Sequence, residues 1–261
     1  MTNSISSSAQ RANTSKAVEY AGRAGFVVNG VLHLLIAWIG LQLALQSYSG
    51  AADQSGALQL LAGNSFGSVA LWLGVVGFAG LCLWALTEAI VGATEPKDRM
   101  VLVAKAVVYA VLSLACLTYA RGQSARSGRS QSVDVTASLM QQPFGRLLVG
   151  LVGAGVVAVG GYHVVKGWQR KFLEDLEQHP GRGVQAAGRV GYVGKGVALG
   201  VVGLLFVLAA LRGQAKQATG LDGALRTLLD LPLGRIIVAL VALGFAAYGC
   251  YSFARAKYAR F

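Results

Sequence analysis

The sequence predicts an all-α membrane protein whose six transmembrane helices form three parallel two-helix repeats, and three observations carry this prediction. Hydrophobic residues make up 54% of the chain and charged residues only 13%, whereas an ordinary soluble domain is about 25% charged. Six apolar runs each approach the roughly 20 residues that a helix needs to cross a bilayer. A register of arginine, lysine, glycine and aromatic residues recurs three times along the chain.

The six apolar runs are rich in Leu, Val, Ala and Gly, and none has proline in its interior. Frequent glycine is better tolerated in a lipid-embedded helix than in a soluble one. We therefore expect one membrane-spanning helix in each run. The runs cover residues 24–46, 66–92, 100–120, 144–167, 190–211 and 233–254.

The basic residues predict the orientation of the chain and its principal partner. The net charge is +12, but Lys and Arg stand mostly at the ends of apolar runs. This is a pattern of membrane anchoring, not a basic face with stacking aromatics, so we expect a lipid bilayer and no nucleic acid as partner. The bias of Lys and Arg favours a cytoplasmic position for both termini. Residues 1–20, polar and without a signal-peptide core, read as a disordered cytoplasmic tail.

The repeats are predicted to cover residues 21–94, 97–172 and 187–261, each with two spanning helices. Aligned on Arg23, Arg99 and Arg189, the sixth following residue is Asn29, Lys105 and Lys195. The second helix of each repeat keeps its own register, with glycine at Gly77, Gly155 and Gly244, and later Glu88, Lys166 and Arg255. Tandem units of the same orientation imply a pseudo-threefold axis along the membrane normal.

A short apolar segment stands in the connection between the two helices of every repeat. These segments predict short amphipathic helices that lie on the outer membrane interface. They are residues 57–61, 136–140 and 225–229.

The pattern resembles the bacterial membrane proteins catalogued as Domain of Unknown Function 1206. The resemblance rests best on Gly188-Arg-Val-Gly-Tyr192 and on the segment from Tyr162 to Phe172, and it extends over nearly the whole chain. It implies three tandem two-helix repeats and brings no activity. The first unit departs from the pattern with Glu88 where the others are basic, and the middle unit lacks the Gly-Arg opening.

Lys105 and Lys195 are the main candidates for a binding site. Each lies about 9 Å deeper in the membrane than the arginine that opens its helix. They can snorkel back to the headgroups, or they can face the interior with Glu88 as their partner. Because small residues follow each deep polar residue, the interior arrangement predicts a basic pocket for an anionic lipid headgroup or small anionic solute. The candidate residues are Lys105, Lys195, Arg99, Arg189, Glu88 and Asn29. Alternatively, these polar groups fix the register of the repeats.

Two histidines on separate membrane helices, His33 and His163, raise a third alternative. A histidine pair in one leaflet is the minimum ligand set of a b-type haem. The repeats do not echo either residue, and a hydrogen-bonded interior histidine explains each one more simply. We therefore expect no cofactor.

The sequence favours a non-enzymatic integral membrane protein, because it contains no nucleophile–base pair, paired carboxylates or zinc signature. The leading prediction is a structural or accessory helix bundle, whose small-residue faces pack the repeats and a membrane protein partner or a second copy. The alternatives are a carrier or binding protein for an anionic or lipid ligand, and a haem-binding subunit.

Overall fold

The computed structural model describes residues 16–93, 95–123, 126–178 and 180–259, and it is helical without strands over these ranges. Its six long helices are each long and apolar enough to cross a membrane, as the hydropathy predicts. The predicted disordered tail, residues 1–20, lies mostly outside the described residues, and its described part is helical. The long helices are α2 (Lys16–Ala44), α4 (Ser65–Val91), α5 (Pro96–Ala120), α7 (Gly145–Trp168), α8 (Arg182–Arg212) and α10 (Gly234–Tyr258).

Helix α3 (Gln54–Ala62), α6 (Gly128–Met140) and α9 (Gly220–Leu229) stand in the three connections where short helices are predicted. We call the end of each long helix that adjoins these short helices its top, and the opposite end its base. Two 3-10 helices, η1 (Lys171–Asp175) and η2 (Ala215–Gln217), complete the described elements. The segment after η1 pairs with the end of α10, where the amide of Glu177 donates to the carbonyl of Tyr258 at 2.8 Å.

Hydrogen bonds join the three top connections in a ring. The amide of Ala52, in the first connection, donates to the Asp222 carboxylate of the third at 2.9 Å. The Ser132 hydroxyl of the second connection donates to a carbonyl of the third at 2.7 Å. The amide of Gly128 in the second connection donates to the Ser55 hydroxyl of the first at 3.0 Å. Each connection therefore contacts both others, as a threefold arrangement requires.

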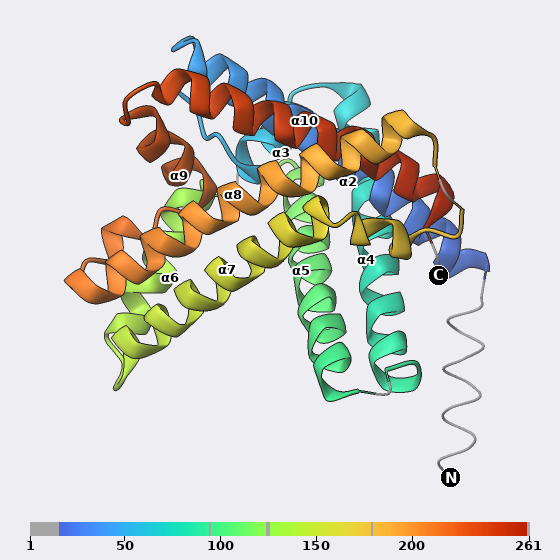
Figure 1. The fold of residues 1–261 in the computed structure, drawn as a ribbon, viewed down its shortest axis with the longest axis horizontal. Coiled ribbons are helices and arrows are strands. Elements are labelled where there is room, and N and C mark those ends of the chain that lie inside the picture. Colours follow the sequence, from blue (N-terminus) through green and yellow to red (C-terminus); the bar gives the residue numbers. More distant parts are fainter. Residues whose placement is uncertain (1–15, 94, 124–125, 179, 260–261) are drawn as a thin grey trace.

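The long helices pack in a cyclic order that crosses the repeat boundaries. The second helix of each repeat packs on the first helix of the next: α4 on α5, α7 on α8, and α10 back on α2. Within a repeat, α2 packs on α4 and α8 packs on α10. In the middle repeat α5 and α7 form no comparable interface over their described residues. Figure 1 shows α4 and α5 running steeply across the direction of α7 and α8.

Glycines show where the helices of one repeat meet. In the first repeat, a Cβ on Gly25 of α2 would lie 2.7 Å from the carbonyl oxygen of Gly77 in α4. In the third, a Cβ on Gly194 of α8 would lie 2.7 Å from the Cα of Gly244 in α10. Only glycine permits this approach. Gly155, which holds the same register in α7, has no atom within 4 Å of a built Cβ.

Candidate functional site

The three arginines that open the first helices join neighbouring repeats at their bases. Arg23 donates from Nη1 to the carbonyl of Ala256 at the end of α10, at 2.8 Å. Arg99 donates from Nε to the carbonyl of Ala89 near the end of α4, at 3.0 Å. The guanidinium of Arg189 lies 4.5 Å from the ring centroid of the tryptophan that ends α7. Each arginine thus satisfies or covers a helix end, which places Arg99 and Arg189 in packing contacts.

The deeper polar residues of the same helices differ in their surroundings. Asn29 donates from Nδ2 to the hydroxyl of Ser252 at 3.0 Å and joins α2 to α10. The ammonium of Lys195 points inward and lies 4.3 Å from the ring centroid of Tyr248 on α10. The side chain of Lys105 keeps exposed surface, yet its charge interacts with Arg255. Lys195 therefore packs on α10, whereas Lys105 is exposed and lies near enough to Arg255 for their charges to interact.

Four cationic side chains from four different helices converge at this place. They interact electrostatically with one another or with shared neighbours, and we call them the basic cluster. The cluster consists of Lys105 of α5, Lys166 of α7, Lys195 of α8 and Arg255 of α10.

Asp175, in η1, is the carboxylate that the structure brings to the basic cluster. It accepts a hydrogen bond from the Lys166 ammonium at 2.7 Å, and both side chains are largely covered. Burial would raise the pKa of Asp175, but the charges of Arg255 and Lys166 outweigh it and hold this pKa below its ordinary value. Asp175 carries a single negative charge, so it neutralises at most one of the four positive charges of the cluster.

Arg255 brings to the cluster a buried donor that lacks a partner among the described residues. Its guanidinium lies 4.2 Å from the ring centroid of Phe26. Its Nε is buried and has no hydrogen-bond partner among the described residues. A buried donor without a partner costs about 1–3 kcal/mol, and more when it carries charge. The guanidinium is therefore prepared to donate to an anion, which would offset that cost.

Aromatic rings form one wall of the basic cluster. Tyr192 of α8 lies 5.3 Å from Tyr248 and 5.6 Å from Tyr251 of α10, measured between ring centroids. The hydroxyl of Tyr251 donates to the carbonyl of Phe172 at 3.0 Å. A Cβ on Gly191 would lie 2.5 Å from the Cα of Tyr248, so this glycine lets α8 approach the wall.

Glu88 occupies a different place from the one predicted. It stands near the base end of α4, where its carboxylate lies close beside Gly92. Asp175, rather than Glu88, forms the ion pair with Lys166, and its charge also reaches Lys105. Sequence reasoning missed Asp175 because it lies between repeats, outside the register that singled out Glu88.

His33 and His163 contact different tyrosines of the aromatic wall. His33 is buried, and its Nδ1 lies 2.8 Å from the Asn29 carbonyl oxygen. The Nδ1 of His163 lies 2.8 Å from a carbonyl oxygen in its own helix. His33 contacts Tyr248 at 4.7 Å, and His163 contacts Tyr192 at 5.6 Å, between centroids. The two tyrosines that they contact lie 5.3 Å apart, between centroids.

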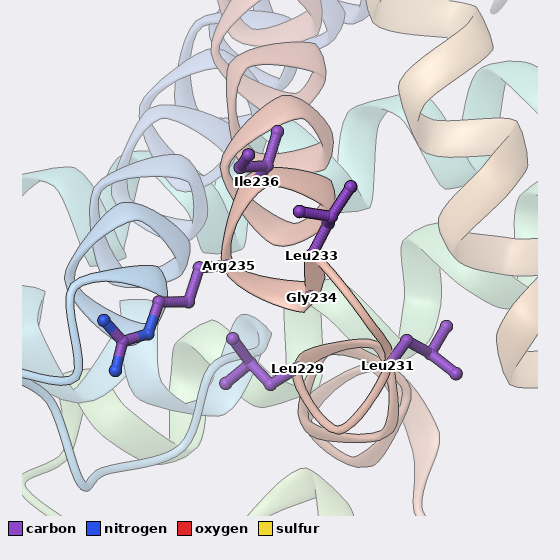
Figure 2. Close-up of a pocket in the computed structure, with 6 residues that line it drawn as sticks. All are labelled: Leu229, Leu231, Leu233, Gly234, Arg235 and Ile236. Atoms are coloured by element: carbon purple, nitrogen blue, oxygen red, sulfur yellow. The ribbon is translucent and has the colours of Figure 1, made fainter.

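Two open hollows lie elsewhere, at the top of α10. One of about 370 Å³ has a mainly leucine lining (Figure 2). A second of similar volume lies beside it, between the ends of α2 and α10. Both are open and apolar, and Arg235 is their charged residue. We assign no site to them. The first is lined by Leu229, Leu231, Leu233, Gly234, Arg235 and Ile236.

Several residues of the site are not among the predicted candidates, but the repeat register could have identified most of them. Lys166 and Arg255 hold equivalent positions in the second and third repeats, and Tyr251 precedes Arg255 by one helical turn. A basic residue one turn after an aromatic one marks the base end of both helices. No such signal identifies Tyr248, which faces the cluster only because α8 and α10 approach closely.

Comparison with known proteins places the chain in a family. It is 26% identical over 249 residues to the "Uncharacterized protein YxxB" of Bacillus subtilis (strain 168), and the alignment covers 91% of this chain and 90% of the relative. No solved structure matches the chain. The profile of one family matches residues 24–92, 100–170 and 190–259, which are three copies of the two-helix unit. The chain is thus a member of the family described as Domain of Unknown Function (DUF1206).

Proposed function

We propose that this multi-pass membrane protein is a non-enzymatic binding protein for an anionic ligand, which the basic cluster holds by a phosphoryl or carboxylate group. The observation that carries the proposal is Arg255, with its buried and unpartnered Nε. Lys105 and Lys195 supply further charge beside it, and Asp175 neutralises only part of the total. Such a site recognises an anion by charge-assisted hydrogen bonds.

The proposal includes the orientation of the protein. The distribution of Lys and Arg favours a cytoplasmic base in a bacterial inner membrane. The cluster would then lie in the inner leaflet, close to the depth of the lipid phosphates. Anionic headgroups and small cytoplasmic anions would both reach it.

A structural role is the second candidate, and the glycine contacts favour it. Close packing at Gly25–Gly77 and Gly194–Gly244 joins the helices within two repeats. The hydrogen bond between Asn29 and Ser252 adds a polar contact between the first and third. In a purely structural bundle the cluster would fix the register of the helices, and no ligand would bind it.

Variants at two arginines of α10 separate these candidates. The full chain is purified in a neutral detergent, and native mass spectrometry measures binding of dihexanoyl phosphatidylglycerol, dihexanoyl phosphatidylcholine and inorganic phosphate. The test variant is Arg255→Gln. The matched control is Arg235→Gln, since Arg235 stands at the top of the same helix (Figure 2).

We expect the wild-type chain to prefer the anionic lipid to the zwitterionic one. A charge-assisted hydrogen bond contributes about 1.5–3 kcal/mol, so Arg255→Gln should weaken binding about tenfold or more, and Arg235→Gln should leave it unchanged. Arg255→Lys, which keeps the charge, should fall between them. Binding of phosphate by itself would show that the anion suffices, whereas binding of the lipid alone would assign the ligand to the bilayer. Equal binding by both glutamine variants, or no preference for the anionic lipid, would contradict the proposal.

The haem alternative has a separate test. Two imidazoles that ligate one haem would give a Soret band in the visible spectrum of the purified chain. Because each imidazole has its Nδ1 beside a carbonyl oxygen of its own helix and packs on a different tyrosine, we expect no such band after expression with added haem. A band that His33→Ala abolishes would restore the haem assignment.

A further inference from the structure

The middle repeat is open where the other two are closed. Gly155 of α7 holds the register of Gly77 and Gly244, both of which meet the first helix of their own repeat. Beside Gly155 a built Cβ meets no atom within 4 Å. In this repeat the described residues of α5 and α7 lack the interface that the other repeats have. We call the uncovered surfaces of α5 and α7 that would form it the open seam.

The other helix of the seam, α5, is exposed at the matching positions. Ala104 of α5 stands where Gly194 stands in α8, counted from the arginine that opens each helix, and it is exposed. Val101 matches Gly25 and Gly191 and has 54% of its surface exposed. Both sides of the open seam thus present surface that the other repeats bury between helices.

One face of α7 leads from the open seam to the basic cluster. Leu151, Gly155, Tyr162 and Lys166 lie at spacings of 4, 7 and 4 residues, which keep them on one side of a helix. Leu151 and Tyr162 have 59% and 57% of their surface exposed. From Leu151 to Lys166 this face extends about 22 Å, longer than the roughly 15 Å of one hydrocarbon leaflet.

We propose that the ligand is an anionic phospholipid whose headgroup binds the basic cluster and whose acyl chain lies in the open seam between α5 and α7. This inference rests on the proposed function and adds the class of ligand and its route of entry. The positive charge at one end of the seam matches the anionic headgroup of a lipid, and the apolar face along the seam matches its acyl chain. Ala104 and Gly155 are both exposed, and α5 and α7 do not pack on each other over their described residues, so a lipid would enter from the bilayer without a change in the helix pairs.

A leucine in the seam tests the acyl site without touching the cluster. Gly155→Leu would fill the seam, and the open space there leaves room for the new side chain. Gly161→Leu is the matched control, because Gly161 is equally open but lies about 240° around α7. Ala104→Leu fills the seam from α5. Native mass spectrometry compares dipalmitoyl with dihexanoyl phosphatidylglycerol on each full-length variant.

We expect the wild-type chain to bind the long-chain lipid at least tenfold more tightly than the short-chain one. Gly155→Leu and Ala104→Leu should remove most of that difference and leave the short-chain affinity unchanged, whereas Gly161→Leu should alter neither. The acyl site is wrong, while the proposed function stands, if both seam variants still bind the long-chain lipid more tightly than the short-chain one. The same holds if the variants lose affinity for both lipids equally. If the wild-type chain binds neither lipid, the lipid proposal fails, and the proposed function fails with it when inorganic phosphate does not bind either. A two-chain mass that Gly155→Leu abolishes would assign the seam to a second copy and overturn the proposal.

Discussion

The ring of Phe172 occupies the space beside Gly188 that a Cβ would fill. Phe172 is fully buried and stacks on Tyr192 at a centroid distance of 5.5 Å. Gly188 opens the Gly-Arg-Val-Gly-Tyr segment, so this contact explains its first glycine. The later glycine, Gly191, admits Tyr248. Both glycines of the motif therefore serve the aromatic wall of the basic cluster.

Two alanine substitutions in α8 should have opposite effects on stability. Gly188→Ala would drive its methyl group into the Phe172 ring, and overpacking of this kind costs about 1–3 kcal/mol. Gly183→Ala meets no atom within 4 Å, and alanine favours a helix over glycine by about 1 kcal/mol. Unfolding in mixed micelles with increasing dodecyl sulfate measures both. A Gly188→Ala variant as stable as wild type would contradict this prediction, because the Phe172 ring would then move aside at little cost in stability.

The ion pair of Lys166 and Asp175 should make stability depend on pH. The pKa of Asp175 lies below its ordinary value near 3.8, because the charges of Arg255 and Lys166 outweigh burial. A carboxylate of this kind stabilises the fold above its unfolded pKa, and the stabilisation disappears as the pH falls through the lower, folded value. Asp175→Asn should therefore be less stable than wild type at pH 7, and the two should converge below about pH 4. Unfolding measured from pH 7 to pH 3 checks this, and a constant difference would contradict it.

The same variant should strengthen anion binding. Removing the Asp175 carboxylate leaves four cations without their acid among the described residues. Inorganic phosphate should then bind several-fold more tightly to Asp175→Asn than to wild type at pH 7. Isothermal titration of the purified chain measures the change. Unchanged or weaker phosphate binding would mean that the cluster serves packing rather than an anion.

The top ring should depend on Asp222 more than on any exposed ion pair. Asp222 is buried and accepts hydrogen bonds from the amide of Ala52 and from Arg226. Asp222→Ala would leave both donors unpaired, at a cost of about 2–4 kcal/mol. Asp134→Ala removes an exposed pair with Arg126, which contributes less than about 1 kcal/mol. Unfolding in mixed micelles should separate the two variants, and equal losses would refute a stabilising ring.

Hydropathy and register predict the six helices and three repeats, because both are local properties of the chain. The order of packing is not local. Gly77, Gly155 and Gly244 share one register, yet Gly155 contacts no neighbouring helix. The difference in sequence lies on the other helix, where Val101 stands at the position of Gly25 and Gly191.

The candidate site was predictable in part for the same reason. Lys105 and Lys195 are singled out by their depth in the membrane and their position in the repeat register, and both belong to the basic cluster. Arg99 and Arg189 share that register but cover helix ends. Asp175 belongs to a connection whose path depends on its pairing with the end of α10, so only the folded chain shows which cations it meets.

A density map of the chain, purified with its native lipids in a neutral detergent, tests the central claim most directly. We predict density for an anionic group within about 2.7–3.2 Å of the Arg255 guanidinium, continuous with an acyl chain between Ala104 and Gly155. Arg255→Gln should remove that density and leave the helices in place. A map in which Arg255 donates to protein groups, with α5 closed against α7, would contradict the account.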